Sequence, residues 1–181
     1  MPEDLLEFLL TAGKLKKTKR TGWVLSKVPH AESVAEHSYR MALMAYVLAA
    51  AGVDRDRLIR MALVHDIGEA ITGDIAAIDP AHKNKDVAER KAVEKISRLI
   101  ENDEVKKLCD EYFDLKTKEA QLLREIDKME MIVQAFEYEE AHPEVNLQSF
   151  WDDVGGMVSR GEIKNKTLVD LFKSLEKRRR R

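Results

Sequence analysis

The sequence predicts an all-α fold of six or more helices, and three observations favour that fold class. Ala, Leu, Glu, Lys and Met are abundant, while the 181 residues include only 8 Gly and 4 Pro, a balance that favours helices. Apolar residues recur at helical spacing along most of the chain. The single cysteine, Cys109, excludes an internal disulfide framework and a Cys-rich zinc module. A chain of this length suits one compact domain.

Charge and hydropathy exclude two classes of partner. The formal net charge of −2 gives no general attraction to nucleic acid, and we expect the basic tail at 178–181 to be a solvated helix end. No apolar run approaches the roughly 18 residues that a membrane span needs. The N-terminal stretch "MPEDLLEFLL" is acidic, unlike a leader segment. We therefore expect a cytoplasmic protein that binds neither membrane nor nucleic acid.

The first half of the chain predicts three helices and two long connections. Leu5, Phe8 and Leu9 predict a helix over 3–12. Residues 13–31 break the periodicity and predict a connection with a basic first half. The segment "SVAE" at 33–36 is a capping-box pattern, so a helix should start there and run to about residue 51. A third helix is expected over about 55–69, and a loop rich in Gly, Asp and Pro follows it.

The second half predicts further helices with short connections. They are expected near 86–102, 103–114, 117–141 and 165–178. Pro143 should end the third of these, and Gly155 with Gly156 predicts a loop before the last one. The single domain thus divides into an N-terminal helix (1–12), a connection (13–31), a core (33–141) and a C-terminal helical extension (142–181).

Polar residues interrupt the apolar faces of three predicted helices. His37 fills a gap in the apolar stripe of one helix, and His65 continues the stripe of the next. Asp127 lies midway between Leu123 and Met131, which are eight residues apart. Each histidine alone could be a core residue with one hydrogen-bond partner, and Asp127 alone could be solvated. Together, nitrogen and oxygen ligands on inward faces suit a divalent metal.

Three sequence blocks carry a family resemblance. The segments "AEHSYRMA" (35–42), "LVHDIGEAITGDI" (63–75) and "REIDKMEM" (124–131) resemble the signature blocks of the HD-domain metal-dependent phosphohydrolases. "KRTGWVL" (19–25) and "ESVAEHS" (32–38) narrow the resemblance to the single-domain 5'-deoxynucleotidases and the HD-domain-containing protein 2 group. The resemblance extends to about residue 140 and implies a helical HD-domain bundle with a buried divalent-metal site.

The resemblance implies a role for each polar residue of these blocks. By similarity, His37, His65, Asp66 and Asp127 would bind one divalent ion, with Mn, Co, Fe, Zn, Ni and Mg all left open. Such an ion lowers the pKa of water and screens phosphoryl charge. His37 and Asp66 would also adjoin the substrate. Glu69 would orient or deprotonate the attacking water, unless it is a plain surface residue at a helix end.

The loop after Glu69 would complete the substrate site. By similarity, Asp74 is both a substrate contact and a catalytic residue near the leaving 5'-oxygen, and residues as far as Ala77 would line the sugar side. The alternative for Asp74 is an ordinary turn aspartate, since it directly follows Gly73.

The connection at 13–31 would supply the phosphate and sugar contacts. A guanidinium grips phosphate through two hydrogen bonds, which favours Arg20. In the bacterial deoxynucleotidases the arginine directly precedes the tryptophan, whereas two residues intervene here, so Lys19 or Lys17 stays open for this role. Trp23 would give a flat wall against the sugar. The alternative is that Trp23 is a hydrophobic plug that pins the connection onto the bundle.

The function that the resemblance implies is metal-dependent hydrolysis of a (deoxy)nucleoside 5'-monophosphate to nucleoside and phosphate. Another phosphohydrolase activity on the same site is the nearest alternative: a phosphodiesterase, a nucleoside triphosphatase or an alarmone hydrolase. A non-catalytic, metal-stabilised interaction module is the alternative from a different class. Relatives are often dimers, so a homodimer is a further expectation. The sequence leaves the base preference open.

Overall fold

The computed structural model describes residues 2–49, 51–76 and 79–180, and within these ranges the chain forms helices and no strand. The predicted all-α fold class is therefore confirmed. The elements in chain order are α1 (Pro2–Gly13), η1 (Lys14–Lys16), α2 (Thr21–Leu25), α3 (Val34–Leu48), α4 (Arg55–Val64), α5 (Glu69–Thr72), η2 (Pro80–Asn84), α6 (Lys85–Leu99), α7 (Asp103–Asp114), α8 (Lys118–Ala141), α9 (Gln148–Ser159) and α10 (Lys166–Arg179).

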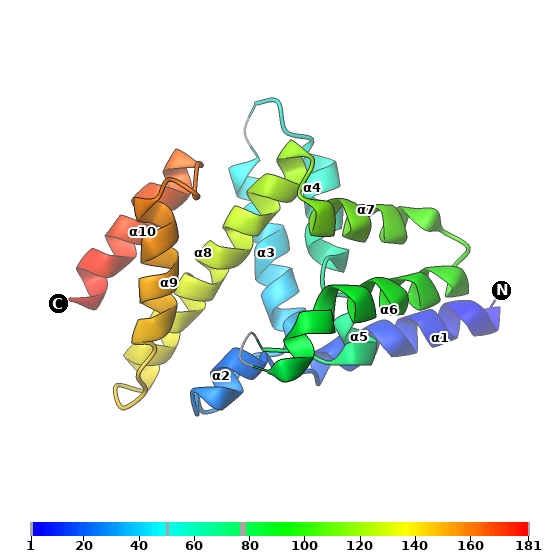
Figure 1. The fold of residues 1–181 in the computed structure, drawn as a ribbon, viewed down its shortest axis with the longest axis horizontal. Helices are drawn as coiled ribbons and strands as arrows, with labels where there is room; N and C mark the ends of the chain where they lie inside the picture. Colours follow the sequence, from blue (N-terminus) through cyan, green and yellow to red (C-terminus); the bar gives the residue numbers. More distant parts are fainter. Residues whose placement is uncertain (1, 50, 77–78, 181) are drawn as a thin grey trace.

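Helix α8 runs through the middle of the molecule and organises the packing (Figure 1). Helices α3 and α4 pack against each other and both pack against α8, while α9 and α10 lie along another part of α8. Helices α6 and α7 pack together beside α4, and α1 lies against α6. The largest fully buried apolar side chains between α3, α4 and α8 are Met41, Leu58, Met61, Leu123, Ile126 and Met129. The three helices with inward polar residues thus meet in one core.

The start of α3 follows the predicted capping box. The Ser33 hydroxyl accepts a hydrogen bond from the backbone N–H of Glu36 at 3.3 Å, and the Glu36 carboxylate accepts one from the backbone N–H of Ser33 at 2.6 Å. These reciprocal bonds satisfy two N–H groups that a helix start leaves unpaired. They fix the register in which His37 enters the core.

The predicted helix over 55–69 is wrong in one respect, because the chain turns after Val64. Residues 65–68 form a turn, and Glu69 begins the separate short helix α5. Gly68 lies against α6, where a Cβ would come 3.1 Å from the carbonyl oxygen of Glu89 and 3.3 Å from Val93. This close contact between segments favours a residue without a side chain. Because of the turn at 65–68, Glu69 does not share a continuous helix with His65.

The predicted loop at Gly155 and Gly156 is also wrong, because both residues lie inside α9. A Cβ on Gly155 would come 3.3 Å from the ring of Phe172 in α10. Here glycine permits close helix packing rather than a turn, and the packing outweighs the low helix propensity of glycine. The predicted connection at 13–31 contains two short helical elements, η1 and α2.

The basic tail is not simply a solvated helix end. Helix α10 continues to Arg179, whose guanidinium donates to both carboxylate oxygens of Glu139 at 2.6 and 2.8 Å. The same guanidinium lies over the ring of Trp151 at 4.7 Å. Arg178 and Arg180 are exposed. None of the helices in the described ranges is long and apolar enough to cross a membrane.

Candidate metal centre and active site

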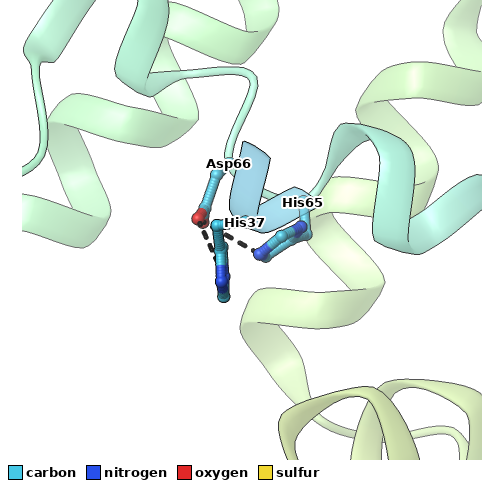
Figure 2. Close-up of side chains that lie close together, drawn as sticks. All are labelled: His37, His65 and Asp66. Atoms are coloured by element: carbon cyan, nitrogen blue, oxygen red, sulfur yellow. Dashed lines mark ion pairs between the residues drawn. The ribbon is translucent and has the colours of Figure 1, made fainter. Parts of the chain in front are cut away.

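Two imidazoles and one carboxylate converge where α3 faces the end of α4. Figure 2 shows His37 from α3 pointing toward His65 and Asp66, which directly follow α4. One ligand atom from each residue lies within 4.8 Å of the other two. Asp127 of α8 joins them, since its carboxylate oxygen lies 3.3 Å from His37 Nε2. The structure therefore brings the four predicted ligands to one place.

Both histidines are oriented through their Nδ1 atoms. The Nδ1–H of His65 donates to the backbone carbonyl of Ala62 at 2.9 Å. The Nδ1–H of His37 donates to the carboxylate of Glu130 at 2.5 Å, and Arg40 donates to the other oxygen of Glu130 at 2.8 Å. Such partners fix the tautomer of a histidine and leave Nε2 with a free lone pair. Both histidines therefore turn Nε2 toward Asp66 and Asp127.

The Nε2 atoms of His37 and His65 indicate whether a metal ion fits this site. Each is buried and makes no hydrogen bond to any residue that the structure describes. A buried polar atom without a partner is unfavourable, and a divalent ion bound by imidazole nitrogen and carboxylate oxygen removes that penalty. The residues present therefore fit a metal that His37, His65, Asp66 and Asp127 would hold.

The charges around these ligands keep the carboxylates ionised. Burial would raise the pKa of Asp66, but the neighbouring imidazoles and the Arg20 guanidinium hold it well below its usual range. For Asp127, burial is likewise outweighed by Lys128 and His37, which lower its pKa. Ionised carboxylates are the form that binds a cation.

Arg20, at the N-terminal end of α2, reaches both aspartates. Its guanidinium nitrogens lie 3.8 Å from Asp66 and 3.9 Å from Asp127. Lys19 instead donates to the backbone carbonyl of Ala31 at 2.6 Å, and Lys17 is exposed. Of the three cationic candidates for the phosphate contact, Arg20 is therefore the one that the structure brings to the metal ligands.

Glu69 and Asp74 lie close to Lys85, which contacts both carboxylates. The Glu69 side chain is only 1% exposed, and Lys85 donates to its Oε1 at 3.1 Å. Burial, together with Asp66 and Asp74, raises the pKa of Glu69 to about 10. Asp74 is held by Thr21, whose backbone N–H donates to the Asp74 carboxylate at 2.6 Å and whose hydroxyl donates to its backbone carbonyl. These two hydrogen bonds join the connection at 13–31 to the loop that follows α5.

A polar cavity of about 420 Å³ lies beside the proposed metal ligands Asp66 and Asp127. It is lined by Arg20, Asp66, Glu69, Lys85, Asp86, Glu89, Tyr112, Phe113, Arg124, Asp127 and Lys128. Because anionic and cationic side chains share its wall, the cavity suits a ligand that combines a phosphate with a metal ion.

Two predicted contacts lie elsewhere or outside the described residues. Trp23 is 1% exposed and belongs to the core, where its indole N–H donates to Glu32 at 3.0 Å. Its ring packs against Phe150 and Tyr138 at centroid distances of 4.5 and 5.5 Å. This burial favours the plug interpretation, and the sugar contact stays a prediction. Ala77 lies outside the described residues.

Sequence reasoning missed three residues of the site. Glu130 follows Asp127 by three positions and therefore shares its helix face, which is a signal that the sequence contains. Arg40 follows His37 by three positions in the same way. Lys85 lies outside the three signature blocks and has no such signal, because its approach to Glu69 depends on the packing of α6 against α5.

Comparison with known proteins agrees with this geometry. A family model described as "HD domain" matches residues 12–163. The chain belongs to the HD-domain family. It is 41% identical over 181 residues to the human protein named 5'-deoxynucleotidase HDDC2, covering 97% of this chain and 86% of that protein.

Two solved structures share the fold of this chain. A conserved hypothetical protein from Pyrococcus furiosus superposes with a TM-score of 0.77 at 35% identity, over 93% of this chain and 99% of that one. A predicted metal-dependent phosphohydrolase from Magnetospirillum magnetotacticum has a TM-score of 0.75 at 28% identity, over 98% and 91%. The HD-domain family and the fitting ligand set together indicate a divalent metal.

Proposed function

We propose that the protein is a 5'-deoxynucleotidase, which hydrolyses deoxynucleoside 5'-monophosphates to nucleoside and phosphate. The observation that carries this proposal is the pair of buried, unpartnered Nε2 atoms of His37 and His65, facing two carboxylates beside a cavity of about 420 Å³. The human relative, 41% identical to this chain, bears the name of that activity.

Each residue then has a chemical task. A divalent ion held by His37, His65, Asp66 and Asp127 would lower the pKa of water and offset charge on the phosphoryl group. Arg20 binds the phosphate oxygens, because a guanidinium can donate two parallel hydrogen bonds.

Glu69 and Asp74 act on the attacking water and on the leaving group. Glu69 would accept a proton from the attacking water through its Oε2, which is buried and has no hydrogen-bond partner among the described residues. A bound cation would make this possible, because it offsets the negative charge of Asp66 and Asp74 that raises the pKa of Glu69. Asp74, fixed by Thr21, lies beside the leaving 5'-oxygen.

The direct experiment is phosphate release from a panel of nucleotides. The purified protein is supplemented in turn with Mn, Co, Fe, Zn, Ni or Mg and given deoxy- and ribonucleoside mono-, di-, tri- and cyclic phosphates. We expect phosphate release from 5'-monophosphates, with the deoxy forms preferred. Turnover confined to cyclic nucleotides or triphosphates would assign a different phosphohydrolase, and metal binding without any turnover would assign an interaction module.

The metal identity, a homodimer and a cytoplasmic location complete the proposal. The metal panel ranks the ions, and sedimentation measures the oligomeric state. Four exposed apolar residues on the outer face of α3 support a contact between copies: Tyr39, Leu43, Tyr46 and Val47. An unpaired apolar face of this kind is typical of an interface.

A further inference from the structure

The cavity of about 420 Å³ beside Asp66 and Asp127 has two uncharged residues in its described wall, and both lie in the last turn of α7. They are Tyr112 and Phe113, and every other described residue of the wall carries a charge. Sites for small molecules usually offer aromatic or apolar surface to the uncharged part of the ligand. The two aromatic residues of α7 are therefore the candidates for contact with the nucleoside part of a nucleotide.

Tyr112 adjoins one of the proposed metal ligands. Its ring meets the imidazole of His65 edge to face, at a centroid distance of 5.2 Å and an interplanar angle of 80°. Tyr112 is partly buried and packs against the core, which restricts its ring to one direction. Phe113, in contrast, has the Arg90 guanidinium over its ring at 4.9 Å, and two carboxylates of α7 hold that guanidinium. Tyr112 thus contacts a metal ligand and the cavity at once, whereas Arg90 covers one face of Phe113.

Trp23, which the family resemblance offers as the wall against the sugar, has almost no free surface for that contact. It is 1% exposed, its ring packs against Phe150 and Tyr138, and its indole N–H donates to Glu32. It is not among the described residues that line the cavity. An aromatic wall against the sugar therefore has to come from another residue.

The covalent structure of a nucleoside 5'-monophosphate brings its sugar close to Tyr112. Only the 5'-oxygen and C5' separate the phosphorus from the furanose ring, so a phosphate at the metal ligands keeps the sugar beside them, where Tyr112 packs against His65. The C2' methylene of deoxyribose is apolar and suits an aromatic ring. A 2'-hydroxyl against the same ring loses its water without gaining a hydrogen bond, which is unfavourable.

We propose that Tyr112 determines the sugar selectivity of this site, because its ring packs against C2' of the substrate and leaves a 2'-hydroxyl without a hydrogen-bond partner. This inference rests on the proposed function and deepens it, since it names the residue behind a preference for deoxyribose. Tyr112 neither moves a proton nor binds the metal. Its removal should therefore change which sugar is accepted, and not whether the metal binds.

Steady-state kinetics on two pairs of substrates test this assignment: deoxyadenosine and adenosine 5'-monophosphate, and deoxycytidine and cytidine 5'-monophosphate, all at saturating Mn²⁺. We expect the wild type to favour the deoxy member of each pair by about 10- to 100-fold in kcat/KM, the discrimination that an apolar wall gives against a hydroxyl. Tyr112→Ala, which admits water beside C2', should reduce that ratio to about threefold or less, mainly by improving the ribonucleotide. Tyr112→Phe, which keeps the ring, should keep the ratio within about twofold of the wild type.

Three controls separate a sugar contact from a structural role of the ring. Tyr112→Ala should keep the Mn²⁺ stoichiometry of the wild type in a titration with Mn²⁺ alone. Trp23→Ala, the matched aromatic control, should lower both members of each pair in proportion. If Tyr112→Ala does not fold, Tyr112→Gln replaces it, because its amide can bond a 2'-hydroxyl and should narrow the ratio in the same way.

The proposal is overturned if Tyr112→Ala keeps the wild-type ratio, or if the wild type turns over both sugars alike. Equal losses on both sugars with weaker Mn²⁺ binding would also overturn it, because they describe a ring that only supports His65. A changed purine-to-pyrimidine ratio with an unchanged sugar ratio would place the base, and not the sugar, against Tyr112.

If the wild type releases no phosphate from any 5'-monophosphate, the proposed function fails instead. Equilibrium dialysis with deoxyadenosine and adenosine 5'-monophosphate then decides for Tyr112. Tighter binding of the deoxynucleotide that Tyr112→Ala abolishes upholds the sugar contact, and any other result, including no binding at all, overturns it.

Discussion

Replacing Glu130 by glutamine should weaken metal binding although Glu130 is not itself a proposed ligand. The Glu130 carboxylate is fully buried and accepts two hydrogen bonds, from His37 Nδ1 at 2.5 Å and from Arg40 Nε at 2.8 Å. Glutamine has nearly the same size but only one acceptor oxygen. It cannot accept from both partners, so Glu130→Gln must break one contact and leave a buried donor unpaired.

The size of the effect follows from those contacts. A hydrogen bond that involves a charged group contributes about 1.5–3 kcal/mol, and about 1.4 kcal/mol corresponds to a factor of ten in an equilibrium constant. We therefore expect Mn²⁺ affinity to fall by about 10- to 100-fold, the range found when a partner behind a metal-binding histidine is removed. The fall in affinity arises because His37 loses the group that fixes its tautomer and ring direction.

Calorimetric titration with Mn²⁺ measures this change directly. Glu137→Gln is the matched control, because Glu137 also accepts from Arg40, at 2.7 Å, but is about half exposed and does not touch His37. The control should bind Mn²⁺ within twofold of the wild type. Equal affinities for wild type and Glu130→Gln would refute the view that Glu130 orients His37, the proposed metal ligand.

Three other substitutions test separate parts of the structure. Asp127→Asn should weaken Mn²⁺ binding and abolish turnover while the circular dichroism spectrum stays helical; normal turnover would remove Asp127 from the ligand set. Trp23→Ala should destabilise the fold by about 3–5 kcal/mol, the scale of buried aromatic truncations, and lower deoxy- and ribonucleotide activity in proportion. An increase in activity confined to ribonucleotides would instead show that Trp23 excludes the 2'-hydroxyl of the sugar. Arg179→Ala should lower Tm by about 2–4 °C, as expected for a loss of about 1 kcal/mol in a chain of this size, whereas Arg178→Ala should not change Tm.

Local sequence signals predicted much of the helical fold but not where tertiary contacts override them. The capping box at Ser33 predicted the start of α3, because both of its hydrogen bonds lie within four residues. Gly68 lies against the Glu89 carbonyl of α6, and Gly155 lies against the Phe172 ring of α10, so both glycines serve close packing between segments. Contacts between distant segments of this kind have no local signature.

In the candidate site, too, some residues could be predicted from the sequence and others depend on tertiary contacts. His37, His65, Asp66 and Asp127 could be proposed because they recur on apolar helix faces and in family-like blocks. The groups that orient them were less accessible to sequence reasoning. Lys85, for example, reaches Glu69, 16 residues away along the chain, only because α6 packs against α5.

The stack of Trp23 on Phe150 links α9 to the segment that carries Arg20. Phe150 also lies 3.4 Å from the position of a Cβ on Gly22, so α2 rests directly on the C-terminal extension. None of the described residues of the extension (142–180) lines the cavity. Exchanging residues 142–181 between relatives should therefore alter phosphate affinity as well as stability. The C-terminal extension therefore supports the segment that carries Arg20, the residue proposed to bind phosphate.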